Sequence, residues 1–270
     1  MRIGKKEFDA EHEPYIMGIL NVTPDSFSDG GMHNTLDTAL AHAERMLLEG
    51  AAIIDVGGES TRPGYTQISE EEEIDRVVPV IEALGKNFDC TISIDTYKAK
   101  VAEASLKAGA HLVNDIWGLQ YDPKMAKVIA DFDAAVCVMH NRKEEFLPYT
   151  SFMEDLLADL SKSLEIAKNA GIRSDGIMVD PGVGFAKTYE ENLMAIRELH
   201  RLKELGYPIL LGTSRKSVIG LTLQVEAKQR VVGTCVTTVV GLKEGASFFR
   251  VHDVKENLEA IRMSKAIYGC

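Results

Sequence analysis

Residues 91–116, TISIDTYKAKVAEASLKAGAHLVNDI, contain the pattern that decides the fold. A short apolar run ends in Asp95, a stretch with helical spacing stops at Gly109, and a second apolar run ends in Asn114. This unit recurs along the chain, where eight short apolar runs each end in a polar residue that could carry chemistry: Asn21, Thr61, Asp95, Asn114, His140, Asp180, Lys216 and His252.

Stretches of helical pattern separate these runs, and most of them stop at a glycine, a common signal for a helix end. They cover residues 35–49, 69–84, 97–108, 122–131, 151–170, 190–205, 226–244 and 254–267. Such an alternation most simply closes into a (β/α)8 TIM barrel, an α/β fold with its active site at the carboxyl ends of the strands. We expect a single domain over residues 1–270, with a barrel core from about 16 to 267. An open, doubly wound sheet is disfavoured, because functional-looking residues end every strand instead of gathering at one switch point.

Composition narrows the class of partner. The chain has 270 residues, a net charge of −11 and a pI of about 5.2, which argues against nucleic acid as the main partner. No apolar run is long enough to span a membrane, and the charged N-terminus has no signal core, so we expect a cytoplasmic protein. The four cysteines lack metal-ligand spacing, and Cys90 and Cys137 lie in or beside apolar runs, which indicates buried free thiols.

Three polar side chains at predicted strand ends suit a planar heterocycle. Taken alone, Asp95, Asn114 and Asp180 could each be no more than a helix cap. Brought together at one barrel mouth, their carboxylate and amide groups match a nitrogen heterocycle that carries amino and oxo groups. Phe185 follows Asp180 closely and could stack on such a ring.

Basic residues follow the last two strands of an otherwise acidic chain. Arg250 and His252 are two positions apart, so on a strand they point the same way and could clamp an anion. Lys216 follows the preceding strand, in the region where (β/α)8 barrels often bind phosphate. At the end of the first strand, Asn21 offers a neutral oxygen that suits a hard cation such as Mg²⁺.

Two loops and one histidine leave alternatives open. Phe27 is an aromatic residue in a polar, turn-forming loop, which fits a lid over a site as well as a surface loop. Thr61 and Arg62 place a hydroxyl beside a guanidinium, which suits an anionic substrate group or a solvated loop equally. His140 is better explained as a structural residue than as a zinc ligand, because no cluster of Cys and His accompanies it.

Seven motifs occur in order at the ends of the predicted strands. They are GILNVTPDSFSDGG (18–31), DVGGESTRPG (55–64), SIDT (93–96), NDI (114–116), DPGVGF (180–185), GTSRKS (212–217) and RVHDV (250–254). No single motif decides the matter, but the ordered set is very specific. From Ile16 to Ile267, the chain closely resembles the dihydropteroate synthase family.

The resemblance implies a transferase of folate synthesis that joins 6-hydroxymethyl-7,8-dihydropterin diphosphate to p-aminobenzoate and releases diphosphate, with Mg²⁺ as cofactor. It implies pterin binding by Asp95, Asn114, Asp180 and Lys216, diphosphate and metal binding by Asn21, Arg250 and His252, and a p-aminobenzoate pocket at Phe27, Thr61, Arg62, Pro63, Ser214 and Lys216. Asp95 and Asp180 would stabilise a pterin cation, with Lys216 at the pterin oxo group. The family further implies a homodimer, formed through helices away from the first two loops, and sulfonamides as competitors.

Two other functions share part of this pattern. A corrinoid-type methyltransferase domain has the same barrel and pterin residues, but it has no use for a diphosphate clamp. A non-catalytic pterin-binding paralogue should lack some loop residues, and none is missing here. Val218 replaces the usual Phe next to the expected p-aminobenzoate pocket, and Cys235 replaces a frequent Ala, so the sequence leaves sulfonamide sensitivity open. It also leaves open the role of the charged segment 140–151.

Overall fold

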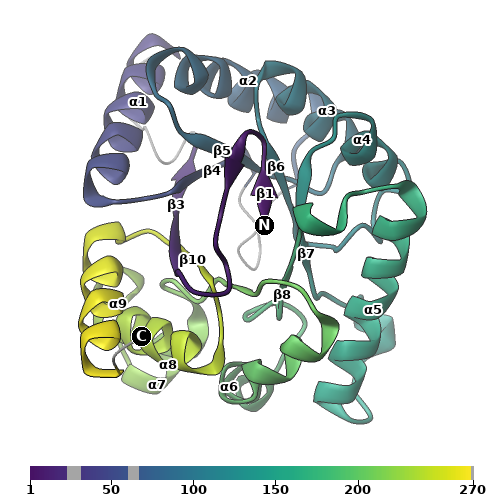
Figure 1. The fold of residues 1–270 in the computed structure, drawn as a ribbon, viewed down its shortest axis with the longest axis vertical. Helices are drawn as coiled ribbons and strands as arrows, with labels where there is room; N and C mark the ends of the chain where they lie inside the picture. The colour runs from purple at the N-terminus through teal and green to yellow at the C-terminus, as the bar shows by residue number, and fades with distance from the viewer. Residues whose placement is uncertain (23–31, 60–66, 269–270) are drawn as a thin grey trace.

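The computed structural model describes residues 1–22, 32–59 and 67–268. Within these residues eight parallel strands form one sheet, in the order β8-β7-β6-β5-β4-β3-β10-β9. They are β3 (Tyr15–Asn21), β4 (Ile53–Gly57), β5 (Thr91–Asp95), β6 (Leu112–Asp115), β7 (Ala135–Met139), β8 (Ile177–Asp180), β9 (Leu210–Leu211) and β10 (Phe248–Val251). Strand β10 pairs with β3, and a parallel bridge between Val179 and Ile209 joins β8 to β9, so the sheet closes on itself. The predicted (β/α)8 barrel is confirmed, and the open sheet is excluded (Figure 1).

Helices surround this barrel (Figure 1). They are α1 (Met32–Glu49), α2 (Glu70–Asn87), α3 (Ala99–Ala108), α4 (Met125–Asp131), α5 (Phe152–Ala170), α6 (Tyr189–Arg197), α7 (Ser217–Leu223), α8 (Val231–Glu244) and α9 (Val254–Tyr268). The predicted helix over 190–205 is shorter than expected, because α6 ends at Arg197 and residues 199–205 continue as a 3₁₀ helix. Helix α7 was missed, since its seven residues are too few to display a helical period, although Val218 and Ile219 are buried in it.

An N-terminal hairpin, which the sequence did not predict, closes one end of the barrel. Strands β1 (Arg2–Ile3) and β2 (Lys6–Glu7) pair antiparallel around Gly4, whose φ is +58°. Ile3 and Phe8 are buried against side chains that point into the barrel, including Phe248. Figure 1 shows this hairpin, in purple, across the centre of the ring. Apolar packing therefore fills this end, which leaves the opposite end for chemistry.

The barrel interior changes from apolar to polar along the strands. Because side chains alternate along a strand, Ile53, Asp55 and Gly57 of β4 share one side. The register of the sheet places Gly57 beside Asp95. Ile53 lies in the apolar cluster near the hairpin, whereas Asp55 and Asn114 are buried polar residues nearer the carboxyl ends of the strands. Asn114, which was predicted from the sequence, and Asp55, which was not, therefore lie together at this carboxyl end.

Cys90 and Cys137 are buried and free, which confirms the predicted thiols. Among the helices that the structure describes, none has the length and apolar character needed to cross a membrane.

Candidate active site

A cation between two carboxylates forms the centre of the barrel mouth. Arg250, on β10, donates through Nε to Asp55 Oδ2 at 2.6 Å and through Nη2 to Asp95 Oδ2 at 2.5 Å. We call Asp55, Arg250 and Asp95 the mouth triad. Asn114, on β6, donates its side-chain amide to the same Asp55 oxygen at 3.3 Å. Two predicted residues, Arg250 and Asn114, thus meet at Asp55, to which the sequence had assigned no role, and Arg250 links them to Asp95.

Each carboxylate of the mouth triad keeps one buried oxygen that has no hydrogen-bond partner among the described residues. These atoms are Oδ1 of Asp55 and Oδ1 of Asp95. Buried polar atoms without a partner are uncommon and costly, so the pair points to a ligand that supplies donors. Burial raises the pKa of Asp95 to about 7, although Arg250 acts to lower it. Burial would lower the pKa of Arg250, but the carboxylates raise it above its ordinary value, so the guanidinium stays charged.

The segment that follows β8 builds the second half of the mouth. Asp180 is buried and accepts a hydrogen bond from Gly182 N at 2.6 Å. Burial raises the pKa of Asp180, while Lys216 acts to lower it. Lys216 donates to the carbonyl of Val183, and its Nζ lies 4.7 Å from the centroid of the Phe185 ring. Burial lowers the pKa of Lys216 to about 8, so its ammonium is available as a donor near neutral pH.

Two glycines leave space next to these groups. A Cβ at Gly212 would lie 3.6 Å from Asp180 Oδ2. A Cβ at Gly57 would lie 3.5 Å from Asn21 Oδ1 and 3.8 Å from Asp95 Oδ2. Larger side chains at either position would fill the mouth, and Asn21, the predicted metal ligand, lies beside the mouth triad.

Apolar side chains adjoin the polar groups of the mouth. Phe185, predicted to stack on a ring, packs with a small cluster that contains Tyr97, Ile116, Trp117 and Met139. Sequence analysis missed these four residues. The available signal was their position, because each lies within three residues of a strand-end Asp, Asn or His.

The predicted anion clamp has partners within the protein. Arg250 is bound to two carboxylates, whereas His252 Nδ1 lies 2.9 Å from Ser214 Oγ. The same hydroxyl oxygen accepts a hydrogen bond from His252 N at 3.1 Å. Arg215, which follows Ser214 in the sequence, forms an ion pair with Asp253. Both predicted clamp residues lie at the carboxyl end of β10, and Ser214 links the segment after β9 to His252.

Four residues of the predicted p-aminobenzoate pocket, Phe27, Thr61, Arg62 and Pro63, lie outside the described residues.

A second buried ion cluster holds the chain on either side of residues 60–66. Lys98 donates to Glu59 Oε2 and Glu73 Oε2, both at 2.7 Å, and to the carbonyl of Ile68 at 2.8 Å. We call Glu59, Lys98 and Glu73 the loop-base triad.

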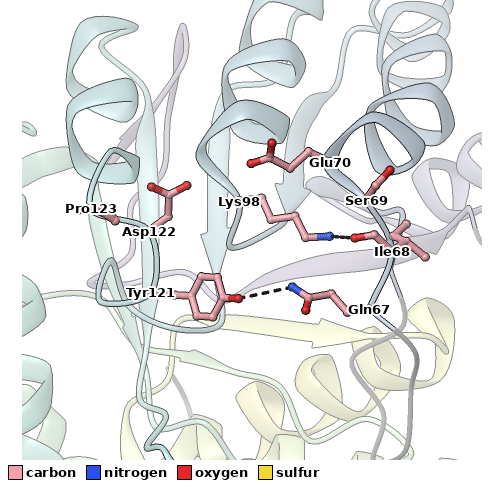
Figure 2. Close-up of a pocket in the computed structure, with 8 residues that line it drawn as sticks. All are labelled: Gln67, Ile68, Ser69, Glu70, Lys98, Tyr121, Asp122 and Pro123. Atoms are coloured by element: carbon pink, nitrogen blue, oxygen red, sulfur yellow. Dashed lines mark hydrogen bonds between the residues drawn. The ribbon is translucent and has the colours of Figure 1, made fainter.

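A surface pocket of about 320 Å³ lies beside the loop-base triad, and Gln67, Lys98 and Tyr121 are among its lining residues (Figure 2). Gln67 donates to the hydroxyls of Tyr97 and Tyr121 at 3.0 and 3.4 Å, and Tyr97 donates to Glu59 Oε1 at 2.6 Å. Lys98 uses its three donors on protein acceptors. The one cation among the described residues that line this pocket is therefore committed to the protein, and we assign no site to the pocket.

Known proteins match this chain over its whole length. The sequence model of the pterin binding enzyme family matches residues 17–252. The dihydropteroate synthase of Clostridium beijerinckii is 57% identical over 268 residues, which are 99% of this chain and 99% of that protein. A crystal structure of dihydropteroate synthase from Clostridium difficile, obtained in the presence of pteroic acid, matches with a TM-score of 0.94 and 54% identity, over 97% of this chain and 99% of that one.

A second solved structure agrees with the first. The dihydropteroate synthase of Yersinia pestis, in complex with a sulfonamide drug, matches with a TM-score of 0.93 and 44% identity, over 100% of this chain and 99% of that one. Identities this high over entire chains establish common descent as well as a common fold. The chain belongs to the dihydropteroate synthase family of pterin-binding enzymes.

Proposed function

We propose that this enzyme joins 6-hydroxymethyl-7,8-dihydropterin diphosphate to p-aminobenzoate and forms 7,8-dihydropteroate and diphosphate, a step of folate synthesis. The observation that carries the proposal is the pair of unpartnered carboxylate oxygens in the mouth triad. With Asn114 and Asp180 they form a set of acceptors and donors that fits the amino and oxo groups of a pterin. A ring without those groups would leave buried oxygens unpaired, which gives the site selectivity.

The reaction needs stabilisation of positive charge more than it needs a base. When the bond between the pterin CH₂ group and diphosphate breaks, the electron-rich ring shares the positive charge. Asp180 is buried and the side chain of Asp95 is only 10% exposed, so both carboxylates would stabilise that charge with little screening by water. Lys216 would donate to the pterin oxo group. The amine of p-aminobenzoate is already neutral, so it can attack the CH₂ carbon without a base and lose its proton afterwards.

The departing diphosphate needs positive charge at the other end of the substrate. We assign this role to Arg250 and His252, together with Mg²⁺ held by Asn21. The Asn21 amide oxygen is a neutral, hard donor beside Asp95, and such oxygens suit Mg²⁺. In the part of the chain that the structure describes, no group of three His, Cys, Asp or Glu could hold a metal, so substrate oxygens would complete the coordination in this proposal. When bound, the ion neutralises charge on the diphosphate.

We place p-aminobenzoate between the segment that follows β9, with Ser214 and Lys216, and the residues Phe27, Thr61, Arg62 and Pro63 outside the described part of the chain. The guanidinium of Arg62 would suit the carboxylate of this substrate. Sulfonamides share the shape of p-aminobenzoate, and we propose that they compete with it here. Val218 is 2% exposed within α7, so in this proposal it affects drug sensitivity through packing.

Release of diphosphate tests the proposed function. We expect release only when both substrates are present, with Mg²⁺ required and a chelator abolishing turnover. Asp95→Asn serves as the inactive control on the same fold. Tight binding of the pterin diphosphate without release would instead favour the non-catalytic pterin-binding paralogue.

We also propose a homodimer formed through α7 and α8. Along α8 an apolar stripe recurs every four residues and is 71%, 57% and 37% exposed at Val232, Val236 and Val240. Leu223, at the end of α7, is 46% exposed. A second copy of the chain would cover this stripe. Light scattering should show a dimer that Val236→Asp converts to a monomer, whereas Leu48→Asp, at an 83% exposed site on α1, should leave the mass unchanged. A monomeric wild type would contradict the dimer.

The compartment and the domain organisation belong to the same proposal. The free thiols of Cys90 and Cys137 suit the reducing cytoplasm, where we place the enzyme. We further propose that residues 1–270 form one domain, which the packing of the N-terminal hairpin into the barrel supports.

A further inference from the structure

Lys187, between β8 and α6, is a cation that the proposed mechanism does not use. Its Nζ donates to Nδ1 of His140, just after β7, at 2.8 Å. It also donates to the carbonyl of Phe185, in its own segment after β8, at 3.0 Å. A longer contact, of 3.5 Å, joins Nζ to the carbonyl of His140. Lys187 therefore ties the segment after β8 to the residue that follows β7.

The contact with Lys187 decides which nitrogen of His140 carries the proton. When Lys187 is protonated its ammonium can only donate, so in that form Nδ1 accepts and the ring proton lies on Nε2. Nε2 faces Asp159 Oδ2 at 3.4 Å, and Asp159 in turn binds Arg142 at 2.5 Å and Lys162 at 2.9 Å. Burial, and then the charge of Lys187, lower the pKa of His140 to about 4, so the ring is neutral near pH 7 and can accept.

Residues 182–187 are shaped by close backbone contacts and by a second lysine. Gly182 has a φ of +68°, and a Cβ there would lie 1.9 Å from the carbonyl oxygen of His140, so only glycine lets the segment pass β7. The stem of Lys216 packs on Gly184, and its ammonium lies over the ring of Phe185. Phe185 is thus held at its carbonyl by Lys187 and at its ring by Lys216.

We propose that Lys187 is a positioning residue for the pterin. By binding His140 and the Phe185 carbonyl, it holds residues 180–185 so that Asp180 and the Phe185 ring face the mouth. The inference rests on the proposed function, because a pterin is the ligand that these two residues would contact. Lys187 acts through Phe185 and not on the substrate, since its ammonium is directed to His140.

The surroundings of Lys187 support this role. Burial lowers the pKa of Lys187 to about 7, with Lys216 and Arg142 acting in the same direction and Asp180 and Glu191 acting in the opposite direction. An apolar side chain could fill such a place without the desolvation penalty of a cation. What the ammonium contributes beyond packing is therefore its hydrogen bonds. One of them ends on His140 and another on the carbonyl of Phe185.

Substitution of Lys187 in the full-length enzyme tests the inference. Lys187→Met keeps the aliphatic stem but removes the hydrogen bonds, and we expect the calorimetric affinity for the pterin substrate to fall about tenfold. The KM for pterin diphosphate should rise similarly, with little change in the KM for p-aminobenzoate. Lys187→Arg keeps the donors and should restore most of the affinity. Lys127→Met, at a 77% exposed position on α4, is the matched control and should change neither value.

A double-mutant cycle separates positioning from a general loss of stability. If Lys187 acts through Phe185, Lys187→Met should cost less affinity in a Phe185→Leu background than in the wild type. Full additivity would overturn the inference, as would a Lys187→Met enzyme that melts earlier but binds pterin normally. Wild-type diphosphate release is measured in parallel. Intact pterin binding without release would count against the proposed function alone, and the cycle would still decide the role of Lys187.

Discussion

Two buried clusters of this protein have the same charges and opposite uses. In each, one cation lies between two carboxylates, in the loop-base triad and in the mouth triad. The loop-base triad is internally satisfied, since Lys98 has three acceptors and Glu59 receives further hydrogen bonds from Tyr97 and Ile68 N. The mouth triad leaves one oxygen of each carboxylate unpartnered among the described residues. Similar charge therefore gives a structural brace in one place and, in the function proposed above, a binding surface in the other.

The difference teaches how to recognise a site in this barrel. An unpartnered buried oxygen costs on the order of 1–3 kcal/mol, which a fold tolerates where a ligand later supplies the donors. In the loop-base triad both oxygens of Glu59 accept hydrogen bonds, so this triad contributes to the stability of the fold. Substitutions in the two triads should accordingly separate stability from activity.

The largest effect is expected from breaking the loop-base triad. Lys98→Met leaves two carboxylates buried without their cation, because the side chains of Glu59 and Glu73 are only 3% and 1% exposed. Removing one partner of a buried ion pair costs about 3–5 kcal/mol, and we expect this loss in the free energy of unfolding measured in urea. Lys100→Met, in the first turn of α3, breaks a solvent-exposed ion pair with Glu70 and should cost less than about 1 kcal/mol. Equal midpoints for the two variants would contradict the structural role of the triad.

A loss of activity without a comparable loss of stability is expected at the mouth. Asp95→Asn and Asp180→Asn each remove a carboxylate that we assign to the pterin cation, so turnover should fall by a factor of about a hundred or more, or about 2–4 kcal/mol. The measurement is diphosphate release at saturating substrate, with thermal melts to show that the variants are folded. Asp89→Asn, whose side chain is 97% exposed, controls for the loss of charge alone. Near-normal turnover of either mouth variant would refute the assignment.

Because of the mouth triad, the free energy of unfolding of the protein should depend on pH. The pKa of Asp95 is raised from 3.8 to about 7 in the folded protein, mainly by burial, so the folded state holds this proton more tightly than the unfolded state. The resulting stability is fully present below about pH 4 and is lost as the pH rises through about 7. Relative to Asp95→Asn, the wild type should lose about 1–3 kcal/mol of unfolding free energy between these limits. A constant difference between the two proteins across this range would show that Asp95 titrates normally.

The smallest effect is expected from removing one hydrogen bond to the loop-base triad. Tyr97→Phe keeps the ring but removes the hydroxyl that donates to Glu59 Oε1. We expect a loss of about 1–2 kcal/mol in unfolding free energy, with diphosphate release retained. Tyr121→Phe is the matched control, since its hydroxyl accepts a longer hydrogen bond, of 3.4 Å, from Gln67 (Figure 2). A change in turnover larger than the change in stability would mean that the two triads are coupled.

Much of the candidate site could be predicted because it lies at the ends of strands. In a parallel barrel all the strands point the same way, so a polar residue that ends a strand must lie at the mouth. Asp95, Asn114 and Asp180 were found by this rule. Asp55 was not, because it lies two residues before the end of β4 and only the alternation of side chains directs it inward. Lys187 was missed because nothing in the local sequence shows that its ammonium turns to His140.

The sequence by itself determined the barrel and the residues available to its mouth. These follow from local rules, since a run of apolar residues, a helical period and a terminal glycine act over a few positions. Only the tertiary structure decided which charges meet. Arg250 reaches Asp55 across 195 positions of chain, and it does so because β10 pairs with β3 and closes the ring. The closing hairpin, the satisfied loop-base triad and the unpartnered oxygens of the mouth likewise depend on long-range packing and strand register, which no local pattern encodes.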